Sequence, residues 1–131
     1  MGFPEDFYRY MELHTLCGVK GGREREGFLN IWMVTVDDRV FARSWNRSAV
    51  SWFTAFQRSG EGQIRYGDQV LNVTGKKLVN EPELNERINA AYLRKYTQEG
   101  NIAYAQGISQ PEYAGYTMEF FYQAEHDDFN V

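Results

Sequence analysis

The strongest pattern in the sequence is a pair of apolar segments joined by a tight turn. Residues 28–36 are apolar at nearly every position, which predicts a strand covered on both faces. Asp37 and Asp38 then form a turn into a second strand over 39–44. Together the two segments predict a β-hairpin.

Apolar residues at helical spacing predict two helices in the first half of the chain. Pro4 favours a short helix over 4–11. After the hairpin, Ser48 is a candidate N-cap for a helix that Gly60 ends. The apolar stripe of that second helix consists of Ala49, Trp52, Phe53 and Phe56.

A third helix is the clearest in the chain. Asn80 and Glu83 have the spacing of a capping box at its start. Its predicted buried stripe consists of Leu84, Ile88, Ala91, Tyr92 and Tyr96.

The remaining segments predict short strands and one long loop. Residues 97–115 lack periodicity, which predicts a loop that covers a pocket and becomes more ordered when a ligand binds. We expect a frayed tail over 123–131. Strands are expected over 13–19, 63–66, 69–74 and 117–122.

Composition restricts the class of protein. A chain of 131 residues that is 43% hydrophobic is expected to form a single domain over 1–131. The net charge of −4 argues against a nucleic-acid partner. There is no apolar run of membrane-spanning length and no signal-peptide core, so we expect a soluble cytoplasmic protein without a membrane partner. Cys17 is the single cysteine, and neither it nor the two histidines fits a metal-ligand pattern.

The best candidate for chemistry is the polar bend between the predicted hairpin and the second helix. Arg43 and Ser44 end the strand, and Arg47 and Ser48 precede the helix. Free N–H groups and the helix dipole favour an anion there, and phosphate fits best. The alternative is an ordinary N-cap in a solvated bend, and these residues leave both interpretations open.

The tryptophans near this bend have different interpretations. Trp45 lies off the helical stripe and is the one we expect to touch a ligand. Trp52 lies on the stripe, which is typical of a core residue, and a platform for a ligand ring is the alternative. No nucleophile–base pair or dinucleotide motif is present, so no catalytic side chain is predicted, and any redox chemistry would belong to a cofactor.

Several segments together resemble a bacterial family of uncharacterised small proteins. That family is assigned to the flavin-binding split-barrel superfamily, alongside pyridoxamine-phosphate-oxidase-like and deazaflavin-dependent nitroreductase proteins. The segments that carry the resemblance are Arg43 and Ser44, Trp52 and Phe53, residues 60–65, and residues 85–96, which include Tyr92, Lys95 and Tyr96.

The resemblance implies a mainly β (α+β) fold, a six-stranded antiparallel split β-barrel with two to three flanking helices. It also implies a homodimer with ligand sites at the subunit interface, and the doubly apolar segment 28–36 fits a buried seam. The implied function is an FMN- or deazaflavin-binding oxidoreductase of unknown substrate. The alternative is a non-enzymatic small-molecule binder that does not hold flavin.

The cofactor-binding residues are predicted from two sources, the family resemblance and the polar bend between the hairpin and the second helix. They are Arg43, Ser44, Trp45, Arg47, Ser48, Trp52 and Arg65. If Arg43 binds a phosphate directly, Arg43→Ala should weaken FMN binding by about 1.5–3 kcal/mol and leave the stability of the ligand-free protein nearly unchanged.

Overall fold

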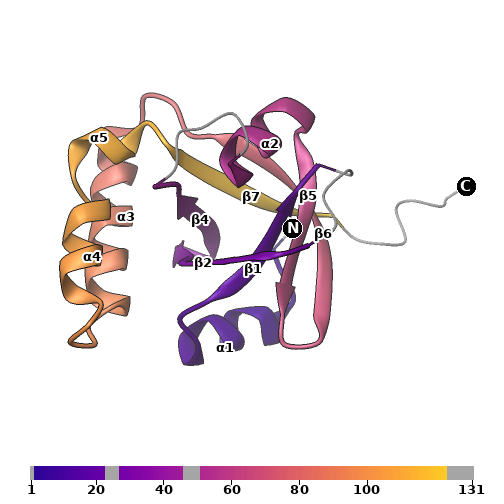
Figure 1. Cartoon of the computed structure of the whole chain (residues 1–131), viewed down its shortest axis with the longest axis horizontal. Coiled ribbons are helices and arrows are strands. Elements are labelled where there is room, and N and C mark those ends of the chain that lie inside the picture. The colour runs from indigo at the N-terminus through magenta and orange to yellow at the C-terminus, as the bar shows by residue number, and fades with distance from the viewer. Residues whose placement is uncertain (1, 23–26, 46–50, 124–131) are drawn as a thin grey trace, which may run out of the picture.

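A curled, seven-stranded antiparallel sheet forms the centre of the computed structural model, which describes residues 2–22, 27–45 and 51–123 (Figure 1). The strand order is β2-β1-β5-β6-β7-β4-β3. The strands are β1 (Cys17–Gly21), β2 (Leu29–Ile31), β3 (Val34–Val36), β4 (Arg39–Arg43), β5 (Glu61–Tyr66), β6 (Gln69–Lys77) and β7 (Thr117–Gln123). The α+β class and the antiparallel sheet agree with the sequence prediction, but the prediction of six strands was wrong.

The seventh strand arises because the apolar segment 28–36 is interrupted. The Met33 N–H donates to the Tyr96 hydroxyl at 3.0 Å, and the Met33 carbonyl accepts from Lys95 Nζ at 2.7 Å. Both backbone groups of Met33 are thus bound by side chains and not by a neighbouring strand. The predicted single strand is therefore divided into β2 and β3, which lie at opposite edges of the sheet.

The predicted hairpin is confirmed between β3 and β4. Asp37 and Asp38 have φ angles of 52° and 65°, the pair of positive values that a two-residue hairpin turn of this hand requires. Along β4 the side chains alternate between two cores. Val40 packs in one core and Phe41 in the other.

The structure has five helices in the part of the chain that it describes. They are α1 (Glu5–Leu13), α2 (Trp52–Ser59), α3 (Pro82–Lys95), α4 (Ile102–Ile108) and α5 (Pro111–Ala114). The loop prediction for 97–115 was wrong, because Ala105 and Ile108 are buried three residues apart and hold a helical turn against α3. None of the described helices is both long and apolar enough to cross a membrane.

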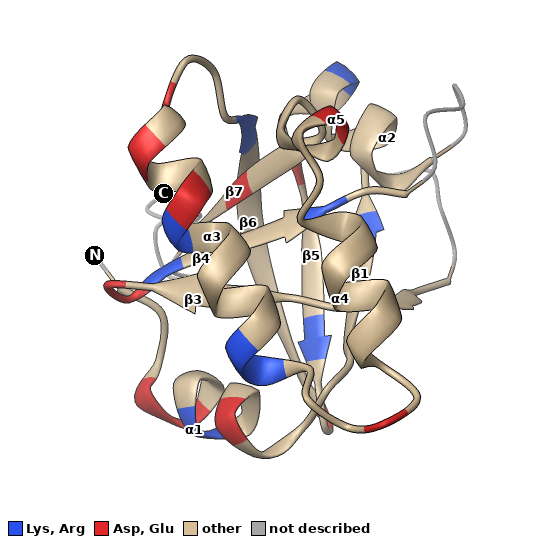
Figure 2. Ribbon diagram, turned by 90° about the vertical axis from the view of Figure 1, so that its left-hand side faces the viewer, with Lys and Arg blue, Asp and Glu red and all other residues tan. Residues whose placement is uncertain are grey.

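The helices cover the sheet in two groups. Helices α3 and α4 lie side by side on the face that Figure 2 turns to the viewer, and they share a core with β3 and Phe41. Helices α1 and α2 contribute to the other core, in which α2 is seated against β1, β5 and β6. Strand β4 has residues in both cores, so its end is fixed from both sides.

Two helix starts differ from their predictions. In α2 the cap is Ser51, whose hydroxyl accepts from the Thr54 N–H at 3.1 Å, and Ser48 lies outside the described residues. In α3 the capping box is absent, because Asn80 adopts a positive φ of 53° and the helix begins only at Pro82. Both buried stripes are confirmed at the positions that the structure describes.

The first strand is also shifted from its prediction. Helix α1 continues to Leu13, and the N–H of His14 donates to the Tyr10 carbonyl at 3.0 Å. Strand β1 begins only at Cys17, four residues later than the predicted strand start at residue 13.

Candidate functional site

A cavity of about 370 Å³ opens between the end of β4, the segment around β2, and α4. Arg43, Ser44, Trp45 and Trp52 all border it, so four of the predicted cofactor-binding residues lie around one space. The other lining residues are Leu16, Leu29, Asn30, Ile31, Trp32, Tyr104 and Ile108.

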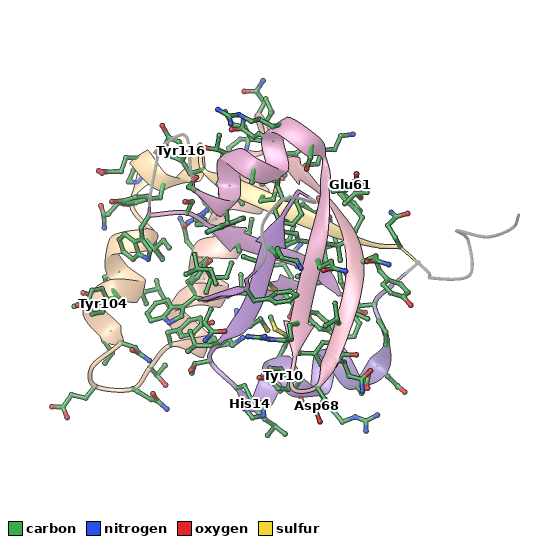
Figure 3. The ribbon with its side chains drawn as sticks, turned by 45° about the vertical axis from the view of Figure 1, so that its right-hand side comes forward. Tyr10, His14, Glu61, Asp68, Tyr104 and Tyr116 are labelled. Carbon is green, nitrogen blue, oxygen red and sulfur yellow. The ribbon has the colours of Figure 1, made fainter. Side chains whose placement is uncertain are left out.

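Aromatic rings form much of the cavity wall. The Tyr104 ring stands perpendicular to the rings of Trp32 and Trp45, with centroids 6.5 and 6.3 Å away. Trp32 is held in place by stacking on Tyr96 at 3.9 Å. Trp45 is 45% exposed and Tyr104 is 62% exposed, and Figure 3 shows Tyr104 on α4 at the outer edge of the molecule. The wall therefore offers accessible ring faces for a planar ligand.

Arg43 borders the cavity but is built into the protein. Its side chain is buried, and its five N–H donors are matched by five acceptors. Nε donates to Thr117 Oγ1 at 2.9 Å, and Nη1 donates to Asn89 Oδ1 and to the Ile108 carbonyl at 3.1 Å. Nη2 donates to the carbonyl and the Oδ1 of Asn85, at 3.2 and 2.9 Å. The guanidinium thus joins β4 to β7, α3 and α4.

The charge of Arg43 has no ionic partner among the described residues. All five of its acceptors are neutral, and no described carboxylate lies within ion-pair distance of it. Burial lowers the pKa of the Arg43 guanidinium, but an arginine side chain remains protonated in proteins. A desolvated positive charge therefore lies beside the cavity, and it favours an anionic group there.

Two further hydrogen bonds fix the backbone at the cavity. The Arg43 N–H donates to the Tyr92 hydroxyl at 2.9 Å, and the Ser44 N–H donates to the Tyr116 carbonyl at 3.0 Å. Burial raises the pKa of Tyr92 to about 12, so Tyr92 keeps its proton at neutral pH. These two hydrogen bonds hold the backbone at the end of β4 in place beside the cavity.

The side chains that hold Arg43 were not predicted from the sequence. Asn85, Asn89 and Tyr92 follow one another at i, i+4 and i+7, so they lie on one face of α3. This spacing was visible in the sequence. The spacing could have indicated a polar stripe beside the apolar one, but it does not reveal which buried cation the stripe binds.

Of the remaining predicted site residues, only Arg65 lies in the part of the chain that the structure describes, and it is not brought to this cavity. Arg65 lies on β5, with its guanidinium 4.6 Å from the centroid of the Phe28 ring, and it does not line the cavity. Arg47 and Ser48 lie outside the described residues. The rings of His14 and Tyr10 are stacked with centroids 4.0 Å apart, and Figure 3 labels the two residues close together. No three described His, Cys, Asp or Glu residues gather in a metal-binding group.

Three solved structures superpose on most of this chain and share its fold. A conserved hypothetical protein from Mycobacterium tuberculosis superposes with a TM-score of 0.58 at 12% identity, over 94% of this chain and 81% of that chain. A FAD-binding protein from Mesorhizobium loti gives 0.53 at 8% identity, over 92% and 88%. A structure described as a domain-swapped dimer gives 0.51 at 15% identity, over 91% and 95%.

Sequence comparison shows the family. No curated protein sequence matches the chain significantly. Residues 10–120 match a family described as an uncharacterized protein conserved in bacteria. That range contains β1 to β6, α2 to α5 and most of β7, and it includes every described residue of the cavity. The resemblance to a bacterial family of uncharacterised proteins is confirmed, and the chain belongs to DUF2255, the family of that description.

Proposed function

We propose that the cavity beside Arg43 binds the planar ring system of FMN or a deazaflavin, and that the protein is an oxidoreductase that uses this cofactor. The observation that carries the proposal is that an aromatic wall and a buried guanidinium, which has no ionic partner among the described residues, border one cavity. The cavity volume of about 370 Å³ lies within the range of small-molecule sites. The FAD-binding neighbour adds support at the level of the fold.

In this proposal Arg43 acts on the cofactor through its charge. Its N–H donors are already used within the protein, so a direct bidentate phosphate contact is not part of the proposal. A phosphate about 6 Å away would still be attracted by about 3 kcal/mol at an effective dielectric constant near 20. Ser44 and Trp45 follow Arg43 directly and border the same space.

The chemistry would come from the cofactor. A bound flavin or deazaflavin accepts and donates hydride, and the protein's part is to bind the ring, orient it and exclude water. Trp32, Trp45 and Tyr104 would hold the ring by stacking, and Trp52, 4% exposed, would form the floor. No side chain is assigned a catalytic role.

The second candidate is a non-enzymatic binder of a different small molecule. The complete occupation of the Arg43 donors favours it, because a phosphate that reached the cavity would find no unused guanidinium N–H. If the wild-type protein bound no flavin, the flavin proposal would be excluded and this second candidate would be favoured.

Titration with FMN and riboflavin tests the first candidate. We expect the wild type to bind FMN at least about tenfold more tightly than riboflavin, because only FMN carries the phosphate. Trp45→Ala should weaken both ligands by about 1–2 kcal/mol, since it removes one ring face. Phe121→Ala is the matched control, because Phe121 is a similarly exposed aromatic residue that does not border the cavity. Equal losses in the two variants would contradict the assignment of this cavity.

We also propose that the protein is a homodimer and that β2 contributes to the subunit interface. Strand β2 lies at a sheet edge, and Leu29 on it is 52% exposed beside the cavity. An exposed apolar edge strand is a template for pairing with another chain. The domain-swapped dimer among the structural neighbours is compatible with such pairing. Sedimentation should give a dimer at micromolar concentration and a shift toward monomer in Leu29→Lys. A wild-type monomer would rule the proposal out.

A further inference from the structure

Lys95 belongs to the motif over residues 85–96 that carries the family resemblance, but the proposed function does not use its side chain. Lys95 is the last residue of α3, and its amine is turned into the protein. Nζ donates to the Met33 carbonyl at 2.7 Å and lies 3.9 Å from Met11 Sδ. The same side chain borders a second cavity of about 370 Å³, which is distinct from the one beside Arg43.

This second cavity is small and has walls of mixed character. Met11, Val34 and Ala91 supply apolar surface, and Thr35 supplies a hydroxyl. The chain thus forms a space that a short organic molecule could fill with its tail against apolar walls and its head at the Lys95 amine.

The charged groups around Lys95 do not neutralise its ammonium. None of the described carboxylates forms an ion pair with it. Burial therefore dominates and lowers the pKa of Lys95 to about 8, while the nearby Cys17 acts weakly in the opposite direction. The titratable or charged groups that face this region are Tyr8 and Glu12 from α1, Cys17 from β1, Asp38 from the β3–β4 turn, Arg94 from α3, and Tyr96, which follows α3 directly.

We propose that Lys95 is a covalent attachment site for small aldehydes, which enter the cavity bordered by Met11, Val34, Thr35 and Ala91. A half-buried lysine that forms no ion pair with a described carboxylate is suited to attack a carbonyl as the neutral amine. Nothing in this proposal depends on flavin binding.

The reaction is a condensation without an oxidant or reductant. The lone pair of Nζ forms a bond to the carbonyl carbon, and the carbonyl oxygen takes up a proton to give a carbinolamine. Loss of that oxygen as water, with the second amine hydrogen released as a proton, leaves the imine. The reverse reaction releases the aldehyde.

Site-resolved labelling tests the proposal on the wild-type protein. The probe is propanal at pH 7 with sodium cyanoborohydride, which reduces the imine to a stable secondary amine. Peptide mass spectrometry then gives the labelling rate of each lysine. Lys76 and Lys77, both exposed near the end of β6, serve as internal controls.

We expect Lys95 to be labelled at least about tenfold faster than Lys76 and Lys77 at pH 7, because a larger fraction of its amine is unprotonated. The advantage should shrink as the pH approaches 10.5, where surface lysines also lose their protons. A Lys95 rate equal to or below that of the two surface lysines at pH 7 would overturn the proposal.

A cavity-filling variant tests whether the reaction requires the cavity. Thr35→Phe on the edge strand β3 places a ring at the cavity wall. We expect it to remove the advantage of Lys95 and to leave the rates at Lys76 and Lys77 unchanged. Undiminished labelling of Lys95 in a folded Thr35→Phe protein would contradict the assignment of the cavity as the aldehyde site.

Discussion

At the scale of single residues, Arg43 connects four elements of the fold through one side chain. Its partners lie on α3, at the end of α4 and on β7, between 42 and 74 residues away in sequence. A contact of this kind stabilises the protein mainly because its removal leaves several buried acceptors unsatisfied. Arg43 is therefore a structural residue as well as a member of the cavity wall.

Arg43→Ala should destabilise the ligand-free protein by at least about 2 kcal/mol, because the Asn85, Asn89 and Thr117 acceptors lose their donor. This replaces the expectation from sequence that stability would be nearly unchanged. Urea unfolding measures the effect. Arg65→Ala, which removes an exposed arginine, is the control and should change the free energy of unfolding by less than about 0.5 kcal/mol.

Lys95 and Cys17 give the stability of the protein two opposing dependences on pH. Lys95 has a pKa of about 8 when folded against 10.5 ordinarily, so the unfolded chain binds more protons between these values and stability rises with pH. Burial raises the pKa of Cys17 to about 11 from 9.0, so the folded protein binds more protons in that window and stability falls with pH.

Lys95→Met should remove the rising contribution and leave the falling one. Between pH 8 and 10.5 its free energy of unfolding should decline relative to the wild type by about 2–3 kcal/mol. Urea titrations at several pH values measure the difference, and Lys76→Met should follow the wild-type curve. Parallel curves for Lys95→Met and the wild type would show that the Lys95 amine is not desolvated.

Sequence reasoning singled out Arg43 but did not predict its structural role. Arg43 was visible because it ends a strand next to a polar bend. The asparagines that bind it were not, because they are about 40 residues away and local spacing does not encode long-range pairing. The core interpretation of Trp52 is confirmed by its burial, whereas the prediction that the exposed Trp45 touches a ligand stays a prediction.

At the scale of elements, α2 lies unusually close to the sheet. The Phe56 ring packs over Gly62 and Gly75, where an added Cβ would come within 2.5 and 2.6 Å of ring atoms. The two glycines are on neighbouring strands β5 and β6. Their missing side chains create the space in which the ring of α2 is seated.

Gly62→Ala should therefore destabilise the protein by about 1–3 kcal/mol through overpacking. The added methyl would also approach the Lys20 carbonyl to 2.3 Å, so the ring cannot relieve the clash alone. Thermal or urea unfolding measures the loss. Gly100→Ala is the matched control, because nothing lies within 4 Å of its added Cβ, and a similar loss there would contradict the packing argument.

The segment 97–115 remains the predicted cover of the cavity, now as helices α4 and α5. Tyr104 and Ile108 of α4 border the cavity directly. We expect hydrogen exchange in α4 to slow when FMN is added, because a ligand against these residues would reduce the opening of the helix. The amides of α1, which does not border this cavity, provide the control. Equal exchange in α4 with and without bound FMN would exclude a covering role.

The errors at this scale have physical causes. The apolar run 28–36 was predicted as one strand because a continuous run of apolar residues indicates burial but not where a strand is interrupted. Both β2 and β3 contain apolar residues, so the run shows no break between them. The interruption depends on Lys95 and Tyr96, more than 60 residues away, which bind the Met33 backbone. Helix α4 was missed because only Ala105 and Ile108 of its residues are buried, too few to give a clear period.

At the scale of the whole molecule, the fold class followed from the sequence more reliably than the strand count. The Asp37–Asp38 turn predicts one antiparallel hairpin and the family resemblance implies an antiparallel sheet, and every pairing among the described strands is antiparallel. The order of the strands was not predictable from local pattern. It places β7 between β6 and β4, although β7 is the last described strand in the chain.

The central position of β7 affects how the protein can fold during translation. Strands β3 and β4 are connected to the rest of the sheet through β7, because β4 pairs with β7 and β7 pairs with β6. While the ribosome is still adding residues before 117, the β3–β4 hairpin and the β1–β5–β6 unit have no common neighbour, and the Arg43 side chain lacks its Thr117 acceptor. A nascent chain stalled at residue 116 should therefore remain sensitive to protease, and resistance should develop only after residue 123 has left the exit tunnel.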